Sequence, residues 1–153
     1  MVGSICLGQD LPFEKMINNT LDKTVPFIKA KELRENNQNY TILDIRELKE
    51  YNVSHIKNAI SISFNDFNIK MIKHKIDKNT PIVVYCSIGY RSEKVGEKLL
   101  NEGFTVYNLY GGIFNWKNSN NPVVNNNEIA TQKVHCFNQE WSKWLLKGEK
   151  IYD

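Results

Sequence analysis

Cysteine is scarce in this 153-residue chain, and its three copies lie far apart, at Cys6, Cys86 and Cys136. Three widely spaced cysteines do not form a disulfide framework, and an odd number leaves at least one thiol free. No group of cysteines and histidines has the spacing of a zinc site, so we expect no bound metal. The cysteine usage favours a reducing compartment, which we take to be the cytoplasm without excluding an organelle.

The sequence also lacks a long hydrophobic run and a strong net charge. No apolar stretch approaches the ~20 residues of a membrane span, and the first thirty residues carry acidic side chains instead of a basic signal pattern. We therefore expect no membrane span, while lipid attachment at Cys6 is left open. Twenty basic and 17 acidic residues give a net charge of +3, too weak to indicate a nucleic acid or an anionic membrane as partner.

The remaining composition is that of a globular protein with one core. Hydrophobic residues make up 41% of the chain, and the length suits one domain of ordinary size. Asparagines around Pro122 indicate a loop before an aromatic tail, in which Trp141, Trp144 and Leu145 have the spacing of a short helix. About 30 residues cannot bury a core alone, so this tail should pack on the domain. We predict an N-terminal extension at residues 1–24, a domain at residues 25–118 and a C-terminal extension at residues 119–153.

Short apolar runs alternate with helical patterns along the domain, which is typical of βαβ units. The run at residues 81–86 (PIVVYC) is nearly continuously apolar, as expected for a strand that is buried on both faces. The pattern therefore predicts an α/β fold with a central, mostly parallel five-stranded sheet and helices on both faces. Strands are predicted at residues 25–28, 41–45, 59–62, 81–86 and 105–109, and helices at residues 30–35, 47–51, 67–74 and 92–101.

The segment from Cys86 to Ser92 (CSIGYRS) has the clearest chemical signal, because it joins the buried strand to the clearest helix. Ligands of α/β sheets bind beyond the carboxyl ends of the strands. A short turn there aims backbone N–H groups at one point, and the next helix adds its positive N-terminal end. Such surroundings favour the thiolate of Cys86 and can hold an oxyanion or a persulfide sulfur. Gly89 gives the turn its backbone freedom, and the permanently charged Arg91 can stabilise an anion.

Simpler interpretations of these residues stay open. A free cysteine is most often a small buried core residue, and Cys86 at the end of a strand fits that description too. Arg91 fits a structural role as well as a substrate role. The order strand, cysteine, glycine, arginine and helix favours the functional interpretation of Cys86.

Several separated motifs lie between about residues 27 and 116. Residues 43–47 (LDIRE) precede Glu50-Tyr51 and residues 55–59 (HIKNA), and CSIGYRS follows at residues 86–92. Gly103-Phe104, residues 109–113 (LYGGI) and Trp116 close the series. In this order the motifs resemble those of the rhodanese family, single-domain thiosulfate sulfurtransferases among them. Residues 131–135 with Trp141 resemble, more weakly, an extension of some single-domain members.

The resemblance implies a rhodanese-like single domain that transfers sulfur. Cys86 would attack the outer sulfur of a small donor, thiosulfate or a persulfide, and pass it through a cysteine persulfide to cyanide, a thiol or a protein acceptor. Asp44 and Arg46 resemble residues that support the site, and no metal or organic cofactor is implied. Arg91 would neutralise charge while the loop amides hold the persulfide. The substrate-binding residues implied in this way are Ser87, Ile88, Gly89, Tyr90, Arg91 and Ser92.

The chain departs from the family pattern in three respects. Ser54 and Asn58 stand where the first signature has glycines, and asparagine tolerates a left-handed turn at position 58. Ser87 stands where many active members have a second arginine, which makes the site less positive and less suited to thiosulfate. Tyr90 is a bulky residue near the entrance to the site.

Two other functions are compatible with the same loop. A phosphatase or arsenate reductase also needs a reactive cysteine, but such enzymes place five residues between cysteine and arginine, whereas four separate Cys86 from Arg91. The shorter loop suits a single sulfur atom better than a tetrahedral oxyanion. A sulfur-relay or interaction module without turnover, with another protein as acceptor, is the second alternative.

Overall fold

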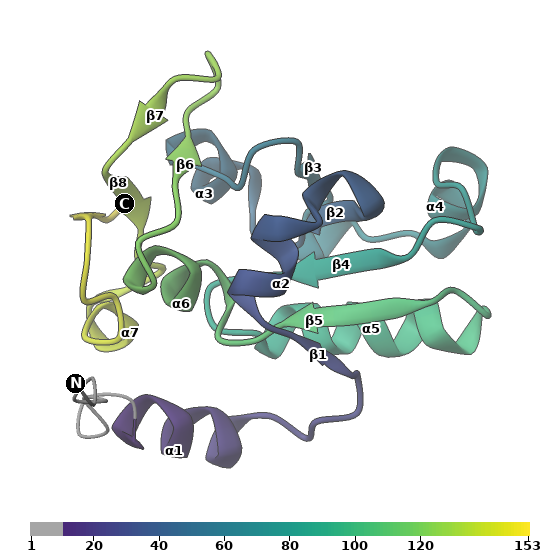
Figure 1. Ribbon diagram of the computed structural model, residues 1–153, viewed down its shortest axis with the longest axis horizontal. Coiled ribbons are helices and arrows are strands. Elements are labelled where there is room, and N and C mark those ends of the chain that lie inside the picture. Colours follow the sequence, from purple (N-terminus) through teal and green to yellow (C-terminus); the bar gives the residue numbers. More distant parts are fainter. Residues whose placement is uncertain (1–10) are drawn as a thin grey trace, which may run out of the picture.

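The computed structural model describes residues 11–153 and is built around one parallel sheet (Figure 1). Its strands are β1 (Phe27–Ile28), β2 (Thr41–Asp44), β3 (Ile60–Ser61), β4 (Ile82–Tyr85) and β5 (Val106–Leu109). They lie in the order β1-β5-β4-β2-β3, and each neighbouring pair is parallel. All the strands therefore end at the same edge of the sheet, where ligands of α/β proteins bind.

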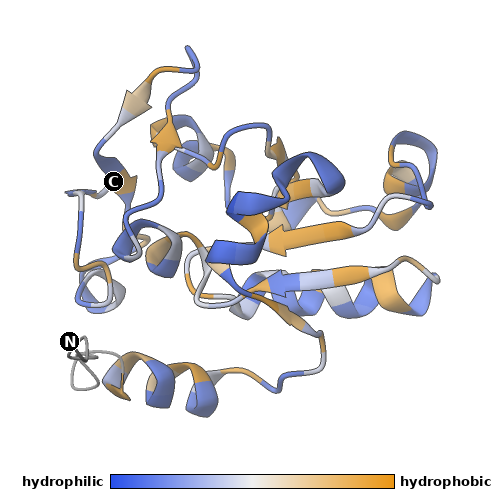
Figure 2. Cartoon of the chain, viewed as in Figure 1, coloured by the Kyte–Doolittle hydropathy of each residue, from blue (hydrophilic) through white to orange (hydrophobic). Residues whose placement is uncertain are grey.

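β4, the middle strand, is buried along its whole length and is coloured as hydrophobic in Figure 2. Val83 and Tyr85 belong to one hydrophobic cluster, whereas Ile82 and Val84 belong to a second. Successive side chains of a strand point to opposite faces, so the two clusters lie on the two faces of the sheet. The predicted burial of this strand on both faces is confirmed.

Helices cover both faces, as predicted. The helices are α1 (Leu11–Thr20), α2 (Ala30–Glu35), α3 (Leu48–Val53), α4 (Ile69–Lys75), α5 (Tyr90–Asn101), α6 (Gly112–Asn118) and α7 (Gln139–Ser142). Apolar side chains of α1, α2 and α6 belong to the cluster of Val83 and Tyr85. Those of α4 and α5 belong to the cluster of Ile82 and Val84. None of the helices in residues 11–153 has the length and apolar character needed to span a membrane.

The five predicted strands and four predicted helices are confirmed, with small differences at their ends. One difference matters for function. The helix expected at residues 92–101 begins earlier, at Tyr90, so the predicted start after the cysteine loop was wrong. Gly89 has a φ of 119° and turns the chain sharply, which allows the Glu93 N–H to donate to the Gly89 carbonyl at 3.0 Å. Arg91 and Ser92 therefore belong to the first turn of α5.

The C-terminal segment after α6 folds against the domain. It contains β6 (Val123–Val124), β7 (Ala130–Thr131), β8 (Lys133–His135), α7 and β9 (Glu149–Ile151), which lie beside α3 and α6 in Figure 1. Leu145 belongs to the same cluster as Val83, and the rings of Phe13 and Trp144 meet edge to face at 5.9 Å. The predicted helical stripe is only partly confirmed, because α7 ends at Ser142, before Trp144 and Leu145.

The N-terminus of α6 lies directly against the cysteine loop. The Ile113 N–H donates to the Cys86 carbonyl at 3.0 Å, and the Phe114 N–H donates to the Ser87 carbonyl at 3.1 Å. Gly112 has a φ of 59°, and a Cβ atom at this position would collide with both carbonyl groups. Only glycine therefore allows α6 to support the loop this closely.

We expect Gly112→Ala to destabilise the protein more than Gly103→Ala. Both positions have positive φ, which costs about 1–2 kcal/mol for alanine. A Cβ at Gly103 meets only the flexible end of Lys78, whereas one at Gly112 meets backbone, which adds about 1–3 kcal/mol of overpacking. Urea unfolding measures the difference, and equal losses in the two variants would contradict close support of the loop by α6.

Candidate active site

Cys86 is the first residue after β4, and the loop from Cys86 to Gly89 joins this strand to α5. The cysteine is only 1% exposed. Its Sγ atom accepts a hydrogen bond from the Gly89 N–H at 3.2 Å, and the Ser92 hydroxyl oxygen lies 3.5 Å from it. The backbone donor stabilises negative charge on sulfur, which is what a thiolate nucleophile requires.

Cys136 has the opposite surroundings, although it is also a buried free cysteine. Its thiol donates to the Val134 carbonyl at 3.6 Å, so the proton is held on sulfur. Burial raises the pKa of the Cys136 thiol, with opposing contributions from Lys150 and a backbone hydrogen bond. Of the two cysteines that the structure describes, Cys86 is therefore the candidate nucleophile, while Cys6 lies outside the described residues.

Asn108, on β5, holds Gly89 and Ser92 in place, the two residues that lie beside the sulfur of Cys86. Its side-chain amide donates to the Gly89 carbonyl at 3.0 Å, and its Oδ1 accepts from the Ser92 hydroxyl at 2.7 Å. The amide therefore fixes both ends of the turn that surrounds Sγ. Asn108 was not predicted as a site residue. Its position as a polar residue inside the apolar run at residues 105–109 was the signal that could have identified it.

Arg91 is held by Glu50 rather than directed at Cys86. Its guanidinium donates to the two carboxylate oxygens of Glu50 at 2.7 and 2.9 Å, and also to the Ser87 hydroxyl at 3.1 Å. Glu50 is fully buried on α3, so this bidentate ion pair ties α3 to the first turn of α5. Glu50 belongs to the motifs that resemble the rhodanese family, but it was not predicted as a site residue.

The charges of this pair stabilise each other against burial. Burial by itself would raise the pKa of Glu50, but the hydrogen bonds and charge of Arg91, with the charge of Arg46, hold it below its usual value. Burial would likewise lower the pKa of Arg91, but Glu50 and Cys86 outweigh it and raise the pKa. Both groups are therefore charged at neutral pH.

Asp44 and Arg46 form a second, fully buried ion pair at the end of β2. The Arg46 guanidinium donates to the Asp44 carboxylate at 3.0 and 2.6 Å, and to the Ser54 carbonyl at 2.7 Å. The Tyr85 hydroxyl donates to Asp44 at 2.6 Å, and burial, followed by the charge of Asp44, raises the pKa of this tyrosine well above its usual value. The pair thus contacts the residue that precedes Cys86, which is compatible with the predicted supporting role.

The other predicted site residues have different positions. Ile88 is buried and belongs to the hydrophobic cluster of Tyr85, so its side chain packs in the core. The ring of Tyr90 is 48% exposed and lies under the ammonium of Lys94 at 5.7 Å. At position 58, the asparagine has a φ of 69°, so the expected left-handed turn is present.

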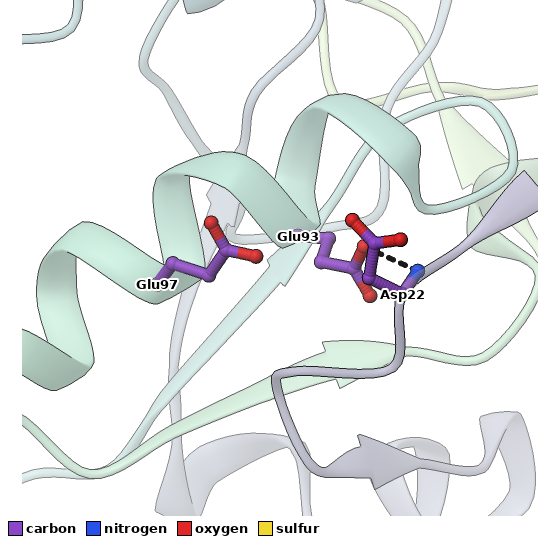
Figure 3. A group of neighbouring side chains, drawn as sticks. All are labelled: Asp22, Glu93 and Glu97. Atoms are coloured by element: carbon purple, nitrogen blue, oxygen red, sulfur yellow. Dashed lines mark hydrogen bonds between the residues drawn. The ribbon is translucent and has the colours of Figure 1, made fainter.

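Three carboxylates lie close together away from the cysteine loop, at Asp22, Glu93 and Glu97 (Figure 3). The oxygens of Glu93 accept the backbone N–H groups of Asp22 and Lys23, at 2.9 and 2.7 Å. The Lys94 ammonium forms ion pairs with Asp22 and Glu97. Lys94 and the two backbone N–H groups thus offset part of the negative charge of the cluster, and the cluster joins the segment after α1 to α5.

Two surface hollows also lie away from Cys86. One, of about 430 Å³, is lined by residues of α4 and α5 and the turn before α4, including Phe67 and Lys98. The other, of about 280 Å³, lies between α6 and the C-terminal segment and is lined by Lys117 and Lys147 among others. Neither includes a residue of the cysteine loop.

The parallel sheet and the cysteine at the end of its middle strand define an α/β protein with a candidate cysteine nucleophile. Residues 29–119 match the family described as the rhodanese-like domain. This match covers more than half of the chain, so the chain belongs to the rhodanese-like domain family.

Individual relatives agree with the family assignment. The chain is 34% identical over 96 residues to a thiosulfate sulfurtransferase GlpE of Coxiella burnetii, which covers 62% of this chain and 87% of that protein. It is 34% identical over 103 residues to a tRNA uridine(34) hydroxylase of Photorhabdus laumondii, but this covers only 29% of the hydroxylase. Thus the chain is similar to proteins with two different named activities.

Solved structures show the same fold. A rhodanese-related protein from Thermoplasma volcanium has a TM-score of 0.60 and 31% identity, covering 65% of this chain and 97% of that one. A rhodanese-like domain protein from Staphylococcus aureus has a TM-score of 0.54 and 29% identity, covering 60% and 90%. The predicted rhodanese-like fold is confirmed.

We expect Glu50→Gln to destabilise the protein by about 3 kcal/mol at neutral pH, because it leaves Arg91 without its buried counter-ion. The pKa of Glu50 is lowered in the folded state from its usual value of 4.5. The ion pair therefore contributes fully above pH 4.5, and its contribution is lost as the pH falls through the lower folded value. Urea unfolding from pH 7 to pH 3 should show the parent and the variant converging at acid pH. Glu140→Gln, at an exposed position, is the control, and a constant difference across this range would exclude the assigned role of Glu50.

Proposed function

We propose that this protein is a sulfurtransferase that moves a sulfane sulfur from a donor such as thiosulfate to an acceptor through a persulfide of Cys86. The observation that carries the proposal is the hydrogen bond from the Gly89 N–H to Cys86 Sγ, beside the start of α5, in a member of the rhodanese-like family. The GlpE relative, named as a thiosulfate sulfurtransferase, supports the same reaction.

The first half-reaction loads the cysteine with sulfur. The Cys86 thiolate attacks the outer sulfur of thiosulfate, a new S–S bond forms, and the original S–S bond breaks with its electron pair leaving on sulfite. The Gly89 N–H already stabilises negative charge at Sγ. The amides of Tyr90, Arg91 and Ser92 head α5, where N–H groups have no partner within the helix, so they are suited to hold the outer sulfur.

The second half-reaction returns the enzyme to its starting state. Cyanide, a thiol or a protein thiolate attacks the outer sulfur of the persulfide, and the electrons of the broken S–S bond return to Cys86 as thiolate. Sulfur is transferred without an external oxidant or reductant. Thiolate chemistry accounts for each step, so the proposal requires no metal or organic cofactor.

The loop side chains have separate roles in this proposal. Ser87 and Arg91 bind each other and Glu50, so they set the shape and charge of the loop. Asp44 and Arg46 support the loop through Tyr85. Sulfur transfer in the cytoplasm, with a small sulfur donor and a thiol or protein acceptor, fits this chemistry.

A sulfur-relay module with a protein acceptor is the second candidate. Each arginine near the loop already has a carboxylate partner, Arg91 with Glu50 and Arg46 with Asp44. A multiply charged donor therefore meets no unpaired arginine, which favours slow turnover of thiosulfate. The relay differs from the enzyme in that the persulfide persists until the protein acceptor is added.

We expect the parent protein, but not Cys86→Ser, to gain the mass of one sulfur atom on incubation with thiosulfate and to release thiocyanate when cyanide is added. Cys136→Ala should behave like the parent, because the Cys136 thiol is buried and donates its proton to a carbonyl. Intact-mass spectrometry and a thiocyanate assay measure the two half-reactions. Equal loading of Cys86→Ser, or hydrolysis of phosphate esters by the parent, would contradict the proposal; loading without thiocyanate release would favour the relay.

A further inference from the structure

Phe137, from the C-terminal segment, contacts Arg91 in the first turn of α5, although it is 46 residues away from Arg91 in the sequence. The guanidinium of Arg91 lies over the Phe137 ring, 5.0 Å from its centroid. Arg91 in turn donates to Ser87, the residue after Cys86. Thus an aromatic ring from outside the matched family region, residues 29–119, contacts the arginine of the candidate active site.

The backbone of Phe137 has an unusual conformation. Its φ is 68°, in the left-handed region that bulky side chains rarely adopt, and the residue is 47% exposed. A large apolar ring in a strained conformation with half its surface in water is not explained by core packing. Such strain persists only where surrounding contacts maintain it, and it gathers at functional sites.

Contacts that run through the preceding His135 support this conformation. The Phe137 N–H donates to Nδ1 of His135 at 3.0 Å, so this nitrogen carries no hydrogen and Nε2 donates to Asp153 at 2.9 Å. Asp153 also pairs with Lys49, which lies on α3 next to Glu50. The helix that holds Arg91 through Glu50 is therefore also linked to the segment that places the ring on Arg91.

Phe137 covers charge that is otherwise open to solvent. The terminal nitrogens of Arg91 are occupied by Glu50 and Ser87, so an anion from solvent would approach the flat surface of the guanidinium. Aromatic rings bind a guanidinium on this surface, through the attraction between the cation and the π electrons. With the ring in place, the Glu50 carboxylate balances the charge of Arg91, and the Phe137 ring covers the flat surface of its guanidinium.

We propose that Phe137 is a positioning residue that keeps Arg91 on Glu50 and away from incoming anions, so that the site selects donors with little negative charge. If the proposed function holds, this role of Phe137 makes persulfides on a neutral or singly charged carrier the preferred donors, ahead of thiosulfate, which is a dianion. Phe137 acts through Arg91 and does not itself need to contact the transferred sulfur.

Alkylation of Cys86 tests the inference independently of any sulfurtransferase activity. Iodoacetate and iodoacetamide react alike, since the thiolate attacks the CH2 carbon and iodide leaves, but only iodoacetate is an anion. The ratio of their rate constants at Cys86, followed by peptide mass spectrometry, reports how well the site accepts negative charge. Phe137→Ala and Phe137→Gly remove the ring, and Phe137→Trp keeps an aromatic surface. Leu146→Ala, at an exposed apolar position of the same segment, is the matched control.

We expect the iodoacetate to iodoacetamide ratio to rise about twofold to fivefold in Phe137→Ala and Phe137→Gly, the factor that corresponds to an exposed cation–π contact. Phe137→Trp and Leu146→Ala should keep the parent ratio. Phe137→Gly should also be more stable than Phe137→Ala, because glycine relieves the positive φ while both variants lack the ring. An unchanged ratio in both ring-deletion variants, or an equal rise in Leu146→Ala, would overturn the inference.

Steady-state kinetics separate this inference from the proposed function. If the parent transfers sulfur from thiosulfate, Phe137→Ala should lower the KM for thiosulfate by the same factor and leave kcat unchanged. The KM for a persulfide on an uncharged alkyl carrier, which has at most one negative charge, should change less. A change in kcat alone would show a general structural effect and overturn the inference. A parent protein that loads no sulfur from any donor contradicts the proposed function, and the alkylation ratio still decides the role of Phe137.

Discussion

The bidentate ion pair between Glu50 and Arg91 is the constraint on which the cysteine loop depends. It connects α3, which follows β2, to α5, which follows β4, so it joins the two helices beyond the carboxyl ends of two paired strands. Buried charges are costly unless they are paired and hydrogen-bonded, and these two satisfy each other. The pair thereby holds the first turn of α5 in a fixed position, and that turn contains Ser92, whose hydroxyl oxygen lies 3.5 Å from the sulfur of Cys86.

Three further contacts hold the same loop from different directions. Asn108 of β5 binds both Gly89 and Ser92, the N-terminus of α6 binds the carbonyls of Cys86 and Ser87, and Tyr85 is held by Asp44. Each contact comes from the end of a strand or the start of a helix at one edge of the sheet. This convergence keeps the sulfur of Cys86 beside the Gly89 N–H.

The C-terminal segment extends this arrangement beyond the region shared with the family. Its strand β8 leads into Phe137, and its last residues reach α3 through Asp153 and Lys49. The arginine of the loop is consequently held on one side by the domain, through Glu50, and on the other by the segment, through the aromatic ring. The side chain of Arg91 therefore links the chemistry of the loop to the placement of the C-terminal segment.

The amino-acid sequence by itself determined the five strands of the central sheet, most of the helices and the position of Cys86, because these depend on local signals. Alternating or continuous apolar runs, a glycine at the turn and the order of the motifs all lie within short stretches of chain. The start of α5 at Tyr90 was missed because the positive φ of Gly89 allows the helix to begin inside the motif. Only the tertiary structure decided that Arg91 faces Glu50, that Asn108 orders the turn and that Phe137 covers the arginine. These contacts join residues far apart in the sequence, and their geometry follows from how the sheet, the helices and the C-terminal segment pack together.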